Sequence, residues 1–142
     1  MSFKDLPPNL RELPLTDPRL AGDVIDLIVS EESRQHGSFG IMMCDELDRG
    51  INPILFSDRD QVADLDGVTR VLSLVLPLVA RVDGGVLLGR GRPRGRCADD
   101  TDRAWHQLAI DLCAEHGVRL LGFHVATCDG VFAMPEPLTA AS

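Results

Sequence analysis

The sequence predicts one α/β domain, of the mixed α+β kind, with a mixed β-sheet flanked by helices on both faces. The chain has 142 residues, a length that fits a single domain. Hydrophobic residues make up 44% of it and aromatic residues only 4%, so aliphatic side chains must fill the core. The elements follow the order helix, hairpin, helix, strand, helix, hairpin, which differs from a regular parallel βαβ series.

The N-terminal part predicts an extended arm followed by a helix. Three prolines exclude regular structure from residues 1–16, which we expect to form the arm. Asp17 and Pro18 are typical of a helix start, and Gly37 is the expected stop. The expected apolar stripe of this helix is Leu20, Ala21, Val24, Ile25 and Ile28.

A β-hairpin and a second helix should follow. Residues 38–44 are expected to be a buried strand and residues 51–56 its hairpin partner, where Pro53 indicates an edge position. We expect Asp66 to cap a helix over residues 67–76, which Pro77 ends or kinks.

The C-terminal part predicts a short central strand, a helix and a second hairpin. The strand covers residues 86–88, and the helix runs from about residue 101 to residue 116, before Gly117. Residues 118–127 and 131–134 are the expected hairpin strands, joined by an Asp-Gly turn. We therefore divide the chain into an arm (1–16), one domain (17–135) and a flexible tail (136–142).

Charge and cysteine content restrict the partners and the compartment. The net charge of −8 argues against general attraction to nucleic acid or to an anionic membrane. The N-terminus does not resemble a signal peptide, and no apolar run is long enough to span a membrane. No CxxC spacing is present, so we expect reduced thiols and a cytoplasmic location. The four cysteines are Cys44, Cys97, Cys113 and Cys128.

One segment concentrates positive charge between the predicted central strand and the helix that follows it. It contains four arginines in seven residues, namely Arg90, Arg92, Arg94 and Arg96. Three acids follow at the expected helix start, namely Asp99, Asp100 and Asp102. Loops between a strand and a helix are where α/β proteins usually place their chemistry.

The chain resembles the JAB/MPN (JAMM) metalloprotease-like superfamily, in particular its RadC-like branch, over roughly residues 20–135. The family motif H-x-H-P-S-G falls on residues 90–95, RGRPRG, and S-x-x-D falls on residues 99–102 after deletion of one residue. The later family motif, rich in Leu and His, falls on residues 117–125, and an Asp-Gly turn follows at 129–130. The resemblance implies a JAB/MPN-like mixed sheet with helices on both faces.

The resemblance also implies a degenerate metal site. In the family, the two histidines and the aspartate hold a catalytic zinc, and an upstream glutamate, which has no match here, activates water. Here Arg90 and Arg92 stand at the histidine positions, and a protonated guanidinium has no lone pair for a metal. Asp102 alone keeps a ligand position. We therefore expect no metal, no cofactor and no zinc hydrolase activity.

These observations leave three functional hypotheses. The preferred one is a non-catalytic scaffold or regulatory module that binds an unknown protein partner or a second copy. In it, Arg90 and Arg92 pair with Asp102, Asp99 or Asp100. The alternative is an anion site for phosphate, nucleic acid backbone or an acidic peptide, with nucleic acid less favoured. That site would consist of Arg90, Arg92, Arg94 and Arg96.

The third hypothesis is an enzyme of another type that uses Cys97 or His124. Cys97 lies in an arginine-rich loop next to a helix start, where a thiol pKa is lowered. His124 lies one position after the histidine of the family motif, so we expect it to face the other side of its strand as a packed residue. We expect His106 on the polar side of its helix.

Overall fold

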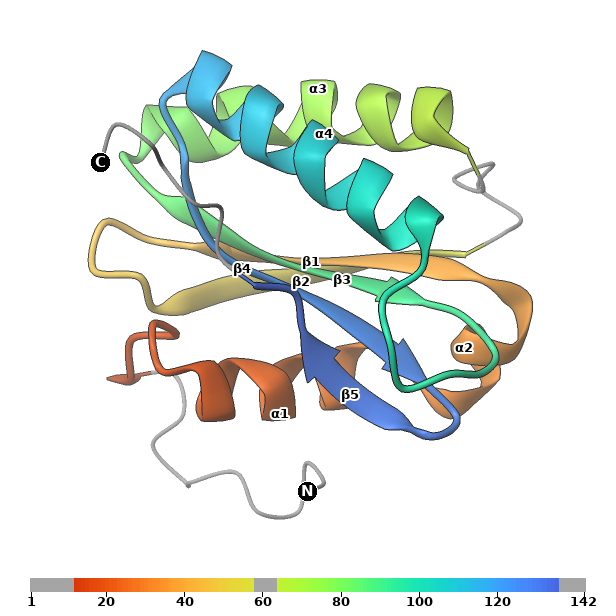
Figure 1. Cartoon of the computed structure of the whole chain (residues 1–142). Helices are drawn as coiled ribbons and strands as arrows, with labels where there is room; N and C mark the ends of the chain where they lie inside the picture. The colour runs from red at the N-terminus through yellow and green to blue at the C-terminus, as the bar shows by residue number, and fades with distance from the viewer. Residues whose placement is uncertain (1–11, 58–63, 136–142) are drawn as a thin grey trace.

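The computed structural model describes residues 12–57 and 64–135 of the chain and shows a five-stranded mixed sheet between two layers of helices (Figure 1). This confirms the predicted mixed α/β class. The helices are α1 (Pro18–Ile28), α2 (Glu31–His36), α3 (Leu65–Arg81) and α4 (Asp100–His116). The strands are β1 (Ser38–Cys44), β2 (Gly50–Ser57), β3 (Gly85–Gly91), β4 (Arg119–Thr127) and β5 (Gly130–Ala133).

The strand order in the sheet is β2-β1-β3-β4-β5. β1 pairs antiparallel with β2 and β3, and β4 pairs antiparallel with β5. β3 and β4 are parallel, and α4 connects them. β3 is therefore the central strand, as the sequence predicts, but it is longer than the expected residues 86–88 and contains Arg90, so the arginine-rich segment begins inside the strand.

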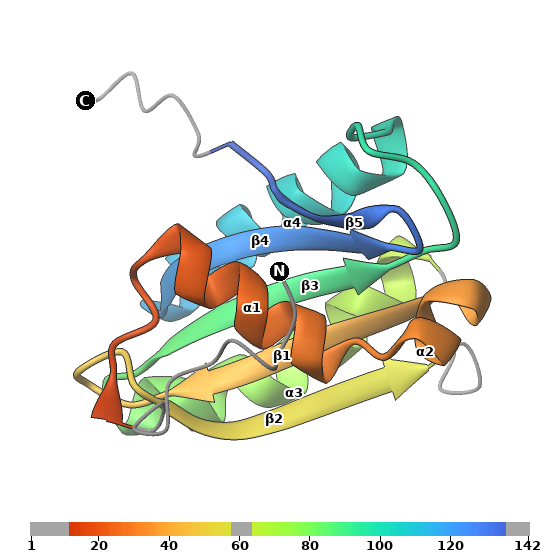
Figure 2. The same ribbon diagram turned by 90° about the horizontal axis from the view of Figure 1, so that it is seen from below.

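Two apolar cores lie on opposite faces of the sheet. α3 and α4 cover one face, where Phe39 packs edge-on against Trp105 with 5.7 Å between ring centroids. α1 covers the other face, as the view from below shows (Figure 2). Strand alternation sends Val86 and Leu88 into the first core and Leu87 into the second.

The predicted first helix is wrong in one respect, because it is two helices. α1 begins after the Asp17 cap with Pro18 in its first turn, as expected, but it ends at Ile28. Ser30 then caps α2, and the buried Arg34 donates to the carbonyl of Val29 at 2.9 Å. Polar groups that satisfy the ends of both helices make the break stable.

The helix α3 is longer than predicted at both ends. Its cap is Asp64, whose side chain accepts from the N–H of Gly67, so the prediction that Asp66 caps it is wrong. The helix continues through Pro77 to Arg81. A proline inside a helix removes one backbone hydrogen bond, and burial of residues on both sides of Pro77 offsets this loss here.

The first hairpin agrees with the sequence prediction. β2 is an edge strand of the sheet, and Pro53 pairs in register with Met42. Residues 1–11 of the expected arm and the expected tail 136–142 lie outside the described residues. Within the described part of the arm, Pro14 bridges to Arg49, and Leu15 is buried in the core beside α1.

In the ranges 12–57 and 64–135, none of the helices combines the length and the apolar character that a membrane span requires.

Candidate functional site

The end of β3 places two arginines on the same face of the sheet. Arg90 and Arg92 are two residues apart, so both side chains point toward α4. Gly89 and Gly91 alternate with them and face α1. A Cβ on Gly91 would lie 2.2 Å from the Ser38 hydroxyl, so only glycine fits there. Close packing on one face thus leaves Arg90 and Arg92 to face the other.

The start of α4 supplies the acids that meet these arginines. Asp99 caps the helix, and its carboxylate accepts from the N–H of Asp102 at 2.7 Å. The Asp102 carboxylate accepts from the N–H of Asp99 at 2.9 Å, which completes a reciprocal capping box. The box fixes the Asp102 side chain beneath the first turn of the helix.

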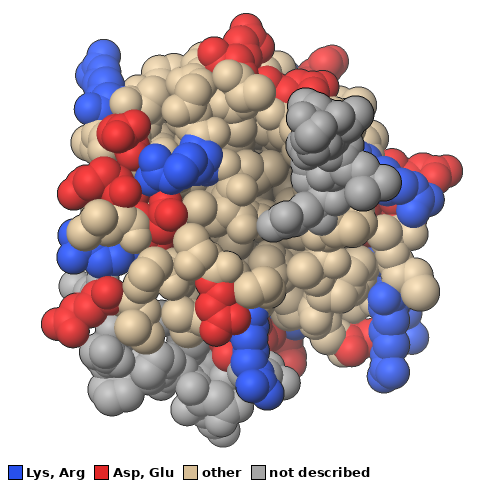
Figure 3. Space-filling model, turned by 60° about the vertical axis from the view of Figure 1, so that its left-hand side comes forward, with Lys and Arg blue, Asp and Glu red and all other residues tan. Residues whose placement is uncertain are grey.

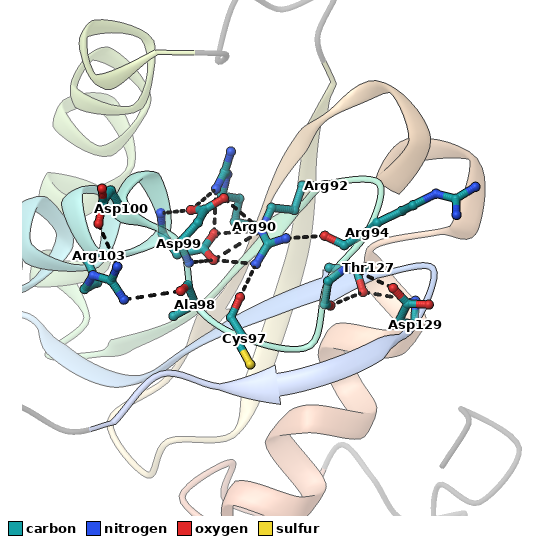
Figure 4. A network of polar contacts seen from close by, with 12 residues as sticks. Arg90, Arg92, Arg94, Cys97, Ala98, Asp99, Asp100, Arg103, Thr127 and Asp129 are labelled. Atoms are coloured by element: carbon teal, nitrogen blue, oxygen red, sulfur yellow. Dashed lines mark hydrogen bonds and ion pairs between the residues drawn. The ribbon is translucent and has the colours of Figure 1, made fainter.

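Arg90, Arg92, Asp99 and Asp102 form one ion-pair cluster, called the arginine cluster below (Figure 4). Arg90 Nη1 lies 2.5 Å from Asp102 Oδ1, and Arg92 Nη2 lies 2.7 Å from Asp102 Oδ2. Arg92 Nε lies 3.1 Å from Asp102 Oδ1. Asp102 is 0% exposed, so two guanidinium groups have replaced water around this carboxylate.

Arg92 also holds the loop between β3 and α4. Its guanidinium donates to the carbonyl of Cys97 at 2.8 Å and to the carbonyl of Arg94. Its backbone N–H donates to the carbonyl of Ala126 at 3.0 Å. The side chain of Arg92 therefore joins the loop to the helix, and its backbone N–H joins the loop to β4.

The turn between β4 and β5 braces the same loop from the other side. The Asp129 carboxylate accepts from the N–H of Gly95 at 2.9 Å, and the Thr127 hydroxyl donates to the Gly95 carbonyl at 2.8 Å. The sequence pattern indicates Asp129 only as a turn residue and does not single out Thr127. No local sequence signal joins positions that are more than thirty residues apart.

Aromatic rings cover both arginines. The guanidinium carbon of Arg90 lies 4.9 Å from the ring centroid of Trp105, and that of Arg92 lies 5.9 Å from that of Phe132. A ring at this distance attracts a cation and excludes water from its other side. The cluster is thus a charged centre within an apolar shell.

Charge pairing keeps the cluster ionised. Burial alone raises the pKa of Asp102, but hydrogen bonds from Arg92, from the Asp99 N–H and from Arg90 outweigh it. The pKa of this carboxyl therefore lies below its ordinary value. The hydrogen bond to Asp102 raises the pKa of Arg92 in turn. Asp102 is therefore an anion at neutral pH, held between two guanidinium groups.

The structure divides the four candidate arginines into two pairs. Arg90 and Arg92 pair with Asp102 and Asp99, as expected, whereas Asp100 pairs with Arg103 at 2.6 Å instead. The side chains of Arg94 and Arg96 are exposed and make no ion pair with the described residues. Arg94 extends away from the cluster (Figure 4). Two of the four arginines in the expected anion site are therefore already paired with acids of the same chain.

The side chains of the two alternative catalytic candidates, Cys97 and His124, do not take part in the arginine cluster. The Cys97 thiol is exposed, and only its backbone carbonyl contacts Arg92. His124 is 3% exposed and points toward α1, where Gly22 leaves room for its ring, which fits the expectation of a packed strand residue. Neither of its ring nitrogens has a hydrogen-bond partner among the described residues.

The prediction for His106 is wrong. Its ring is buried and packs against Phe123 with 5.3 Å between centroids, although the sequence placed it on the polar side of the helix. α4 contacts both the sheet and α3, so it buries more than one stripe of its surface. Burial lowers the pKa of His106.

Across residues 12–57 and 64–135, no three His, Cys, Asp or Glu side chains group as metal ligands would. No protein-family model, curated protein sequence or solved structure matches this chain. The case for a functional site therefore depends on the geometry of the arginine cluster and on the residues at its positions.

Proposed function

We propose that this chain is a non-catalytic, RadC-like member of the JAB/MPN superfamily that acts as a partner-binding or regulatory scaffold. The observation that carries the proposal is the double contact of Arg90 and Arg92 with the buried carboxylate of Asp102. The motif resemblance aligns these three residues with the zinc ligands of the family. In this chain the three side chains bind one another.

The chemistry of the cluster supports a role without metal. A guanidinium remains protonated and offers only donors, so neither arginine can ligate zinc. Both Asp102 oxygens already accept hydrogen bonds from arginine. A scaffold role follows by analogy with metal-free relatives of metalloenzymes, and its partner is another protein or a second copy of the chain.

The test restores the histidines. We expect the wild-type protein to bind no stoichiometric zinc in calorimetric titration, and the double variant Arg90→His, Arg92→His to bind one zinc ion per chain. Adding Asp102→Asn to the double variant is the matched control and should remove binding, because the carboxylate is the third ligand. Circular dichroism checks that each variant is folded.

Two results would contradict the proposal. Stoichiometric zinc on the wild-type protein would show that the centre is a working metal site. A folded double variant that binds no zinc would remove the link between this cluster and a former metal site.

A second candidate function is anion binding by Arg94 and Arg96, which the structure leaves exposed and without ion pairs to the described residues. Arg94→Ala plus Arg96→Ala should then weaken the binding of a labelled single-stranded DNA and lower its salt dependence. Arg81→Ala removes one exposed positive charge elsewhere and is the control. Equal binding by all three proteins argues against this candidate.

We further propose that the protein works in the reducing cytoplasm. All four cysteines are free, and burial raises the pKa of Cys44 and of Cys113 to about 12. Thiols of this kind are compatible with a compartment in which disulfides do not persist.

A further inference from the structure

Within residues 12–57 and 64–135, the outer edge of β4 is paired along only part of its length. β5 pairs with residues from His124 to Thr127, and the N–H of Met134 donates to the carbonyl of Phe123 at 2.7 Å. Along 119–122, no strand among the described residues lies on this side. Four residues of strand edge, about 13 Å, therefore continue the β4–β5 ladder with no partner strand in the described part of the chain.

A bulge marks this open segment. β3 pairs with Leu120 and with Gly122 but passes over Leu121. Bulges occur frequently at sheet edges and beside sites, where they redirect side chains. Leu120 accordingly packs toward the α4 face and Leu121 toward the α1 face.

A cavity of about 440 Å³ lies beside the open edge, between α4 and β4. The other residues that line the cavity carry no charge, and burial lowers the pKa of its single histidine, His106, which favours the neutral ring. On the side of the molecule where β4 begins, a broad uncharged area lies in the middle and most charged side chains surround it (Figure 3). The apolar residues that line the cavity include Ile110, Ala114, Leu120, Phe123 and Met134.

We propose that this edge and cavity bind an extended peptide segment of a partner protein, with apolar side chains at every second position. An unpaired edge presents backbone N–H and C=O groups that only another extended chain can satisfy together. Alternate side chains of an added strand point to the same face of the sheet, and here that face lies over the cavity. This inference rests on the proposed partner-binding role and names the chemistry of the partner.

The boundaries of the site favour a short peptide over a second copy of the domain. Gly117, at the connection from α4, limits it at one end, and Met134 limits it at the other. α4 forms a wall along one side. A slot of about four residues admits one extended chain.

The experiment starts from a phage-displayed library of random peptides selected on the full chain. We expect the selected peptides to share apolar residues at alternate positions. A selected peptide, synthesised with a fluorescent label, should bind Ala114→Trp at least about tenfold more weakly than wild type in anisotropy titrations. Glu115→Trp adds the same bulk to the neighbouring exposed position and is the matched control, expected to bind as wild type.

Backbone methylation of the peptide tests for strand pairing. Every second amide of an added strand donates to the edge, so N-methylation of one alternate set should abolish binding, and methylation of the other set should leave it unchanged. Equal tolerance of both sets would overturn the inference, because the cavity would then bind side chains without an added strand.

Three other results would also overturn it. The library could yield no peptide sensitive to Ala114→Trp. Light scattering could show a dimer that the same variant dissociates, which would assign the edge to a second copy. Peptide binding could require removal of residues 136–142, which would assign the edge to the chain itself. None of these results affects the zinc test of the proposed function.

Discussion

Two buried polar sites lie on neighbouring strands of the sheet and differ in how the loss of water around their polar groups is offset. The arginine cluster lies between the end of β3 and the start of α4, and His124 points from β4 toward α1. Arg90 stands in register with Val125, the residue after His124. In the cluster each charge has an opposite charge within 3.5 Å, whereas both nitrogens of His124 lack a described partner.

The difference follows from the charge state of each group. A buried carboxylate keeps its charge only if counter-charges and hydrogen bonds replace the lost water, and a guanidinium, which stays protonated, needs the same partners to offset the cost of burial. An imidazole can become neutral instead. Burial lowers the pKa of His124, and the backbone carbonyl of Pro18, which lies near the ring but outside hydrogen-bond geometry, opposes this shift only in part. The cluster is therefore fixed by ion pairs, and His124 is tolerated as a neutral ring.

The largest predicted effect is that of Asp102→Ala. This change leaves Arg90 and Arg92 beside apolar side chains without their central counter-charge. Breaking a buried ion pair on one side typically destabilises a protein by about 3–5 kcal/mol, and we expect a loss of this size. The free energy of unfolding, from urea denaturation, measures it.

Two further variants control this experiment. Asp100→Ala removes a neighbouring acid whose side chain is exposed and pairs with the exposed Arg103, so we expect little change. The triple variant Arg90→Leu, Arg92→Met, Asp102→Leu removes all the buried charges at once and should recover stability relative to Asp102→Ala. A stable Asp102→Ala protein would show that water can replace the carboxylate in the cluster.

The second prediction concerns pH and the neutral histidines. The pKa values of His106 and His124 are lowered from 6.5 in the folded protein, so the unfolded chain takes up protons first as the pH falls. The free energy of unfolding should therefore decrease below about pH 6.5. The slope is at most about 1.4 kcal/mol per pH unit for each histidine that stays neutral.

His124→Leu tests this assignment. The variant should flatten the decrease between pH 6.5 and pH 5, since one of the two histidines that bind protons on unfolding is gone. The control is Gln107→Leu, which replaces an exposed side chain of α4 that does not titrate, and it should leave the slope unchanged. Equal slopes for wild type and His124→Leu would mean that His124 is protonated in the folded protein as well.

Much of the cluster could be predicted from the sequence because it follows local rules. Strand alternation places Arg90 and Arg92 together, and the acids of a helix start stand a few residues later in the chain. The brace from Thr127 and Asp129 depends on contacts across the sheet and leaves no local pattern. The burial of His106 was missed for a related reason, since only the packing of α4 against two neighbours shows it.

The helix boundaries show the same limit. Gly117 ends α4 as predicted, because its φ of 68° is a backbone conformation that glycine adopts freely. The cap of α3 is Asp64, two residues before the expected Asp66, and its side chain accepts from the N–H of Gly67. Pro77 predicts an end, but core packing on both sides of it holds the helix together.

The smallest predicted effect concerns Asp99, which lies at the edge of the arginine cluster. Asp99 is half exposed, and it both caps α4 and contacts Arg90 at 3.1 Å. Asp99→Asn keeps an oxygen that accepts from the Asp102 N–H, whereas Asp99→Ala loses it. We expect Asp99→Ala to lower the free energy of unfolding by about 1 kcal/mol and Asp99→Asn to lower it less. Urea denaturation compares the two variants, and equal losses would mean that the charge of Asp99, and not its cap, stabilises the helix start.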